Sequence, residues 1–235
     1  MKYPVAERFF SVQGEGVYSG TPMAFLRLTG CSVGKRICQH CDTDFDTTLP
    51  WLGGGDYNEA ELALWTNHYT HVCLTGGEPF DHETAPLVHA LRAKGKIVHV
   101  ETSGTVAFDV DKHGQFDHIC VSPKPGCRPD MLEIADEIKV IVPGLGTNES
   151  LLKLSGYGGQ GATPTDWGLR AVAGTLHWFT LDEARFWARK KIVFLQPRNG
   201  KLDIDKDKLA LCQQLVDQYP ELRLSVQLHK VLRVR

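Results

Sequence analysis

The sequence predicts an α/β protein built on a mainly parallel sheet, either open or closed into a barrel. Short apolar runs alternate with stretches of helical periodicity along the 235 residues. Most of these runs are apolar throughout, as expected of strands that are covered on both faces. Polar or glycine-containing motifs follow several runs directly, and in a parallel sheet the loops after the strands converge on one edge.

Seven runs have the length and composition of strands. Their repeated alternation with helical stretches, together with burial on both faces, favours parallel pairing within one α/β domain that spans residues 1–235. The runs comprise residues 24–28, 71–75, 97–101, 118–121, 138–142, 192–195 and 222–228.

Four helices are expected between these strands. Two begin with capping boxes, Asn58-x-x-Glu61 and Thr180-x-x-Glu183. A third has a proline in its first turn and a glycine just after its last turn, and a fourth shows apolar residues at helical spacing. They cover residues 58 to about 68, 86–95, 180 onwards and 205–219.

Residues 144–168 do not follow this alternation of predicted strands and helices. The segment is rich in Gly, Ser and Thr and has little periodicity. We expect a long surface loop inserted in the domain, which is either disordered or a lid over the functional site, since long loops are often functional.

The composition limits the function classes. The formal net charge is -2, so bulk electrostatics favour neither nucleic acid nor membrane as a partner. No run approaches the roughly 20 apolar residues of a membrane span, and the N-terminus does not resemble a signal peptide. We therefore expect a cytoplasmic protein whose partners are small molecules or proteins.

Three cysteines lie within eleven residues, at Cys31, Cys38 and Cys41. Three thiolates can hold three irons of a 4Fe-4S cube and leave the fourth iron open to another ligand. A structural zinc site with His40 is the alternative, because three cysteines and one histidine form an ordinary zinc set. Zinc ligands normally come from two separated pairs, whereas here one loop supplies all three thiols, which favours the cluster.

The other four cysteines are less informative. Cys73 and Cys120 lie in predicted strands and Cys212 lies on the apolar side of a predicted helix, so all three are expected to be buried free thiols. Cys127 follows Pro125-Gly126 in a loop and is the candidate for a fourth thiol near a cluster.

Four polar motifs stand at the ends of predicted strands. Gly and Pro end strands in many proteins, so simple turn chemistry explains each motif alone. In the first of them, the two glycines have backbone freedom to turn their carbonyls toward the ammonium group of a bound amino acid. The motifs are Thr75-Gly-Gly-Glu78-Pro79, Glu101-Thr-Ser-Gly104, Ser122-Pro-Lys124 and Gln196-Pro-Arg198.

Taken with the cysteine loop, these motifs resemble those of radical S-adenosylmethionine enzymes, and more closely those of the 7-carboxy-7-deazaguanine synthases. The matching motifs occur in order along the chain, apart from residues 144–180. The first interval between cysteines has six residues where the superfamily usually has three, and a loop of this length closes at little extra cost. Beyond the four strand-end motifs and the three cysteines, the resemblance rests on Gln13-Gly-Glu-Gly16, Arg27, Gly30, Asp42-Thr43, Glu137-Ile-Lys139 and Ser225-Val-Gln-Leu-His229-Lys230.

The resemblance implies a fold and a reaction. The fold is an incomplete β/α barrel, shorter than a full eightfold barrel, and the protein is expected to be a homodimer. The reaction is conversion of 6-carboxy-5,6,7,8-tetrahydropterin to 7-carboxy-7-deazaguanine with loss of ammonia, a lyase step in queuosine and other deazapurine biosynthesis. It requires a 4Fe-4S cluster, S-adenosylmethionine, Mg²⁺ and an electron donor such as flavodoxin or ferredoxin.

The resemblance also implies roles for individual residues. Gln13, Gly14 and Glu15 offer hydrogen-bond donors and acceptors to the edge of an aminopyrimidinone ring. Arg27 can donate two parallel hydrogen bonds to a substrate carboxylate. Without the resemblance, Gln13 and Glu15 are explained as turn residues, Arg27 as a strand-edge cation, Thr43 as a turn cap and His229 as a core residue of the last strand. The implied cluster ligands are Cys31, Cys38 and Cys41; the S-adenosylmethionine site comprises His40, Asp42, Gly77, Glu78, Ser122, Pro123, Lys124 and Gln196; the substrate site comprises Val12, Gln13, Gly14, Glu15, Arg27, Thr75 and His229; Thr43 binds Mg²⁺.

Two other functions remain open from the sequence. An activase that places a glycyl radical on a partner protein shares the cysteine loop and the Gly-Gly-Glu-Pro motif, but Gln13 to Gly16 with Arg27 suits a small planar acid better than a peptide. A zinc-stabilised binding module is the other alternative, and it would be colourless where an iron–sulfur protein is brown.

Overall fold

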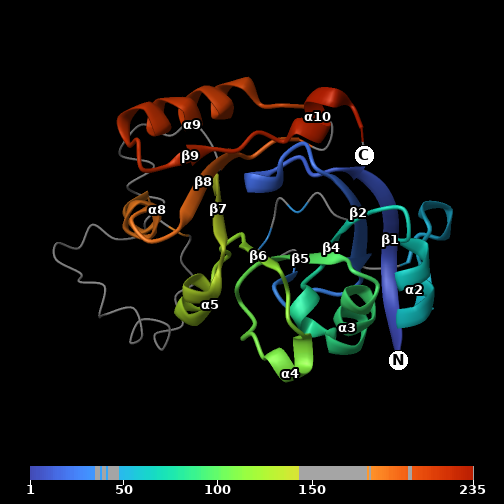
Figure 1. Cartoon of the computed structure of the whole chain (residues 1–235). Helices are drawn as coiled ribbons and strands as arrows, with labels where there is room; N and C mark the ends of the chain where they lie inside the picture. Colours follow the sequence, from blue (N-terminus) through green and yellow to red (C-terminus); the bar gives the residue numbers. More distant parts are fainter. Residues whose placement is uncertain are drawn as a thin grey trace.

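The structure is a computed structural model that describes residues 1–34, 38, 41, 48–142, 179, 181–200 and 203–234. Its centre is a nine-stranded sheet with the order β3-β1-β2-β4-β5-β6-β7-β8-β9 (Figure 1). The strands are β1 Lys2–Val12, β2 Pro22–Leu28, β3 Gly55–Asn58, β4 His71–Gly76, β5 Ile97–Thr102, β6 His118–Val121, β7 Glu137–Val142, β8 Ile192–Pro197 and β9 Arg223–Leu224.

Most of the sheet is parallel, as predicted. Strands β2 and β4 to β9 run in one direction, whereas β1 is antiparallel to both of its neighbours, β2 and β3. Within the described residues, the edge strands β3 and β9 do not pair with each other, so the sheet stays open. The described helices are α2 Glu59–Trp65, α3 Ala85–Ala93, α4 Val110–His113, α5 Pro129–Ile134, α8 Leu181–Ala188, α9 Lys206–Gln218 and α10 Leu228–Leu232.

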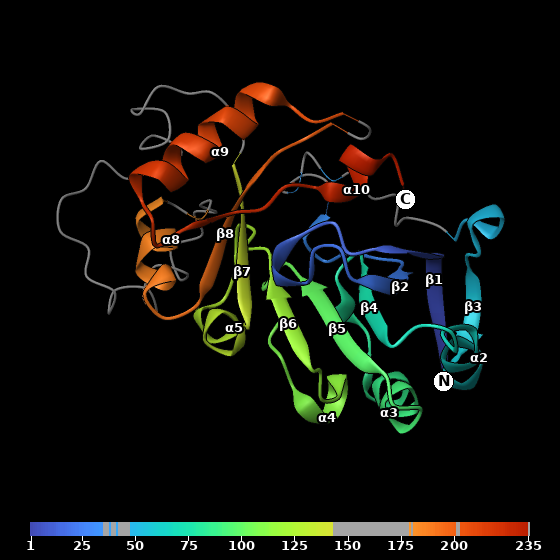
Figure 2. The same cartoon turned by 45° about the horizontal axis from the view of Figure 1, so that its top comes forward.

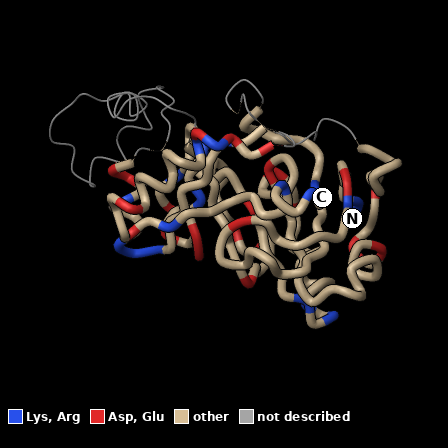
Figure 3. The backbone as a smooth tube through the Cα atoms, turned by 90° about the horizontal axis from the view of Figure 1, so that it is seen from above, with Lys and Arg blue, Asp and Glu red and all other residues tan. Residues whose placement is uncertain are grey.

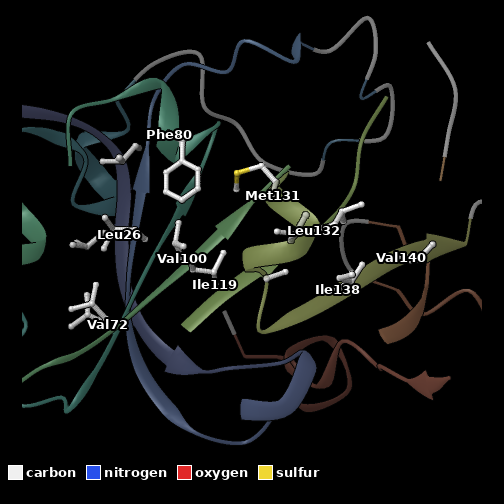
Figure 4. Close-up of a cluster of buried hydrophobic side chains, with 14 of the residues drawn as sticks. Leu26, Val72, Phe80, Val100, Ile119, Met131, Leu132, Ile138 and Val140 are labelled. Carbon is white, nitrogen blue, oxygen red and sulfur yellow. The ribbon is translucent and has the colours of Figure 1, made fainter. Parts of the chain in front are cut away.

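One face of the sheet forms the main core with the helices. Helices α3, α4 and α5 follow one another along the same side of the sheet (Figure 2). Alternate strand residues such as Leu26, Val72 and Ile138 point to this side and pack with Met131 and Leu132 of α5 (Figure 4). The opposite face carries polar residues on several strands, because successive side chains of a strand alternate between faces.

The predicted helix signals are confirmed where the structure describes them. Asn58 and Glu61 form the reciprocal capping box of α2, although this helix ends at Trp65 rather than near residue 68. Pro86 lies in the first turn of α3, and the Asp205 side chain caps α9. Thr180 lies outside the described residues.

The last predicted strand is largely wrong. Only Arg223–Leu224 pairs as β9, and α10 begins at Leu228, so His229 lies on a helix. The alternating pattern of residues 222–228 has another cause. Ser225 and Gln227 are buried because their side chains bind Gln196 and Glu15.

Charges of both signs lie along the backbone of the described residues (Figure 3). No helix in the described part of the chain combines the length and the apolar character needed to cross a membrane.

Candidate active site at the carboxyl edge of the sheet

A cavity of about 250 Å³ opens where the parallel strands end. All four polar strand-end motifs contribute to its wall, as does each of the three clustered cysteines, which confirms that these segments converge. The lining residues include Glu15, Arg27, Cys31, Cys38, Cys41, Thr75, Gly77, Glu101, Thr102, Ser103, Ser122, Lys124, Lys139, Gln196, Arg198, Asn199, Gln227 and His229.

Cys31, Cys38 and Cys41 line this cavity as half-buried thiols that form no disulfide among the described residues. The backbone N–H of Cys38 donates to the carbonyl of Gly34, and that of Cys41 donates to the carbonyl of Cys38. Among the described residues, no three His, Cys, Asp or Glu side chains converge on a single ion position. A cuboidal cluster spreads three thiolates over three irons, and three thiols in the wall of one cavity supply that ligand set.

The predicted ligand candidates His40, Asp42 and Thr43 lie outside the described residues. The long segment 144–168 also lies outside them.

The glycine pair after β4 brings the cysteine loop close to the strand ends. A Cβ on Gly77 would lie 1.5 Å from the carbonyl oxygen of Gly30, the residue before Cys31. The N–H of Gly77 donates to Leu28 and that of Glu78 donates to Gly30, both at 3.0 Å. Close backbone contact of this kind requires glycine. Gly77 thus has a packing role, beside the predicted contact with a ligand.

Glu78 is fully buried and turned away from the cavity. Its carboxylate accepts hydrogen bonds from Thr102 Oγ1 at 2.7 Å and from the backbone N–H of Ser103 at 2.8 Å. It therefore fixes the turn after β5, where Thr102 and Ser103 line the cavity.

Lys124 enters the cavity beside the cysteine loop. Its Nζ donates to Ser122 Oγ at 2.7 Å and to the Ser122 carbonyl at 2.9 Å. Burial lowers the pKa of Lys124. Pro123 is buried but is not part of the cavity wall.

A buried ion network forms the opposite wall. Lys139 of β7 pairs with Glu15 and lies 3.4 Å from Glu101 of β5. Burial alone would raise the pKa of Glu15, but the Lys139 ammonium and a hydrogen bond from Gln227 lower it to about 2. Burial opposes charge on Lys139 as well, yet the two carboxylates raise its pKa above the ordinary value. Glu15 and Lys139 are therefore both charged at neutral pH.

Neutral side chains hold this network in place. Gln13 Nε2 and Thr75 Oγ1 donate to the two oxygens of Glu101, at 3.3 and 3.2 Å. Gln13 is buried directly after Val12, the last residue of β1. Gln13 therefore reaches the network without lining the cavity itself.

The C-terminal segment closes the cavity over residues 13–16. Gln227 Nε2 donates to Glu15 at 2.7 Å, and the N–H of Leu228 donates to the Gly14 carbonyl at 2.9 Å. A Cβ on Gly14 would lie 2.1 Å from Nδ1 of His229, so glycine is required for this packing.

The comparisons with known proteins decide the family. No family model matches the chain. The curated 7-carboxy-7-deazaguanine synthase of Bradyrhizobium diazoefficiens is 33% identical over 250 residues and is covered completely, as is this chain. The chain belongs to the 7-carboxy-7-deazaguanine synthase family. The synthases of Burkholderia multivorans and Caulobacter vibrioides are 30% and 32% identical, again over 99% or more of both chains.

A solved structure agrees with this membership of the 7-carboxy-7-deazaguanine synthase family. The crystal structure of QueE from Escherichia coli aligns with a TM-score of 0.63 and 26% identity, over 97% of this chain and 95% of that one. The predicted incomplete β/α barrel of the radical S-adenosylmethionine type is thereby confirmed.

The structure also brings together residues for which the sequence predicts no individual role. Glu101 and Lys139 belong only to matching motifs, and Gln227 lies in a segment predicted to be a strand. A lysine in the mainly apolar strand Glu-Ile-Lys-Val-Ile-Val is the signal that could have identified Lys139.

Proposed function

We propose that this protein is a radical S-adenosylmethionine enzyme that converts 6-carboxy-5,6,7,8-tetrahydropterin to 7-carboxy-7-deazaguanine with loss of ammonia. The observation that carries the proposal is one cavity lined both by Cys31, Cys38 and Cys41 and by the Glu15–Lys139–Glu101 network. Full-length similarity to synthases of that name supports the same reaction.

The three cysteines would hold a 4Fe-4S cluster, for which their shared cavity wall is suited. The chemistry that such a cluster supplies when bound is one-electron reduction of S-adenosylmethionine. Gly77, Ser122, Lys124 and Gln196 line the cavity, and we assign them to this cosubstrate with the predicted His40, Asp42, Glu78 and Pro123. Glu78 would act by fixing Ser103 rather than by direct contact.

The pterin would bind against the charged wall. Ionised Glu15 accepts hydrogen bonds only, so it suits the N–H donors of an aminopyrimidinone ring. Arg27 suits the substrate carboxylate, because its guanidinium can donate two parallel hydrogen bonds. Thr75 and His229 line the same part of the cavity wall. Val12, Gln13 and Gly14, which directly precede Glu15, would support this wall without lining the cavity.

Further features of the family extend the proposal. Thr43 would contribute a hydroxyl to Mg²⁺, which prefers oxygen ligands and retains several waters. We propose in addition a homodimer in the cytoplasm that receives its electron from flavodoxin or ferredoxin and feeds queuosine or a related deazapurine pathway.

Anaerobic reconstitution tests the function. The reconstituted protein should be brown, contain iron and sulfide, and form 7-carboxy-7-deazaguanine from the pterin when S-adenosylmethionine and a reductant are present. A Cys38→Ser variant should lose colour and product together. A wild-type protein with an intact cluster that forms no deazaguanine would rule the reaction out, and a colourless protein without iron would rule out the enzyme class.

A further inference from the structure

Strand β1 has an irregularity beside the cavity. Its pairing with β2 shifts between Val5 and Glu7, so that Val5 lies opposite Leu28 and Glu7 lies opposite Arg27. In a regular strand, residues two apart share a face. Here Val5 packs in the helix-covered core, whereas Glu7 forms an ion pair with Arg27 in the cavity wall. The bulge therefore turns Glu7 toward the site, as β-bulges beside active sites often do.

Backbone contacts hold this bulge in place. Ala6, the residue between Val5 and Glu7, is fully buried, and its carbonyl accepts a hydrogen bond from Leu49 at 2.8 Å. A Cβ on Gly54 would lie 2.2 Å from the same carbonyl oxygen. The segment after the cysteine loop is thus fitted closely against the bulge.

Glu7 and Phe9 hold the Arg27 guanidinium from two sides. Glu7 Oε1 lies 2.8 Å from Arg27 Nε, and the two side chains are 13% and 27% exposed. The Arg27 guanidinium carbon lies 5.4 Å from the centre of the Phe9 ring, which itself stacks on Phe25. Because a guanidinium is planar, a carboxylate oxygen 2.8 Å from Nε and an aromatic ring beside it together restrict the directions of its terminal nitrogens.

We propose that Glu7 is a positioning residue that orients Arg27 for the carboxylate of the pterin substrate. The proposal rests on the proposed function, since it takes Arg27 as the carboxylate site. Glu7 does not itself contact the substrate. Its role is to supply a negative charge at a fixed place beside the guanidinium, so both the charge and its position matter.

Three substitutions test the charge and its position. Glu7→Ala removes the carboxylate, Glu7→Asp keeps the charge but shortens the side chain by one methylene, and Glu7→Gln keeps the length of the side chain without the charge. Affinity is measured anaerobically by calorimetry for 6-carboxy-5,6,7,8-tetrahydropterin and for 5,6,7,8-tetrahydropterin, which lacks the carboxylate. Glu221→Ala is the matched control, because Glu221 forms an ion pair with the Nε of Arg185 at the same distance, 2.8 Å, and neither residue lines the cavity.

The ratio of the two affinities is the deciding quantity. All three Glu7 variants should lower it by about tenfold or more, as expected for a misaligned charge-assisted contact, with kcat changed much less than KM. Glu221→Ala should leave it within about threefold of wild type. Equal losses for both pterins, a raised ratio in Glu7→Ala, or a ratio within about threefold of wild type in Glu7→Gln would overturn the proposal. If Glu7→Ala does not fold, the Asp and Gln variants still decide. A wild type that neither binds nor converts the pterin refutes the proposed function instead.

Discussion

At the scale of single residues, Lys139 shows how the cavity keeps charge inside the protein. It is 5% exposed and lies between Glu15 and Glu101, which come from two other segments of the chain. A buried charge is tolerated only when it is paired and hydrogen-bonded. The network therefore stabilises the fold and also presents fixed acceptors to a ligand.

Removing this cation should be costly. Lys139→Met leaves Glu15 and Glu101 facing each other without compensation, and we expect a loss of about 3–5 kcal/mol in the free energy of unfolding, together with loss of pterin binding. Urea denaturation and anaerobic calorimetry measure the two effects. Lys208→Met is the control, since it breaks the partly exposed pair with Asp205 at the start of α9 and should cost far less. Equal stability of the two variants would contradict a structural role for the network.

His99 makes a separate prediction about pH. It is buried on the polar face of the sheet, where its ring contacts His71 at 2.9 Å and the edge of Tyr18. Burial, with the neighbouring His118 and His71, lowers the pKa of His99 to about 4. The folded state therefore takes up this proton less readily than the unfolded state, whose histidine pKa is about 6.5.

The stabilising effect of neutral His99 is present above about pH 6.5 and is lost as the pH falls toward 4, by up to about 1.4 kcal/mol per pH unit. Unfolding free energies of wild type and His99→Gln, measured between pH 7 and 4, should fall less steeply for the variant. His89→Gln, which changes an exposed histidine of α3, should follow wild type. Parallel curves for wild type and His99→Gln would show that His99 does not carry the effect.

At the scale of elements, the cysteine loop depends on the strand beside it. Gly77 follows β4, and the approach of its backbone to Gly30 sets the position at which Cys31 enters the cavity. The Gly-Gly-Glu-Pro motif thus supports the cysteine loop through backbone packing, and the turn after β5 through Glu78.

A side chain at Gly77 should therefore disturb cluster binding. Gly77→Ala places a Cβ 1.5 Å from Gly30 O, so the two loops must separate and the reconstituted protein should contain less iron and sulfide per chain. Gly200→Ala is the control, because among the described residues a Cβ there meets only Asp203 O, at 3.9 Å. Metal analysis and visible absorption give the result, and full iron occupancy in Gly77→Ala would show that the contact is dispensable.

At the scale of the whole molecule, local patterns predicted the repeated part of the fold well. Strands β4 to β8 were predicted because they are buried on both faces, and the capping box at Asn58 set the start of α2. Strand β1 was missed because its bulge at Ala6 interrupts the alternation of apolar and polar residues. The site was predicted in part, since the cysteines and the strand ends do meet. The partners of Glu15 are residues 139 and 227, which lie too far away in the sequence for a local pattern to reveal the contacts.

The same long-range contacts make a prediction about the chain as a whole. Residues 225–229 bind residues 13–16 through Ser225, Gln227 and Leu228, and Glu15 of that segment belongs to the charged wall to which we assign the pterin. The cysteines contact other segments, since Gly77 packs against Gly30 and Cys31. A chain that ends at Leu224 should therefore lose affinity for the pterin and unfold at a lower temperature, yet still bind iron and sulfide.

Val231→Ser, which changes an exposed residue of α10, should leave all three properties unchanged. Calorimetry, thermal unfolding and metal analysis of the two proteins check this separation. Loss of iron together with pterin affinity would mean that cluster and substrate sites depend on a single cooperative structure.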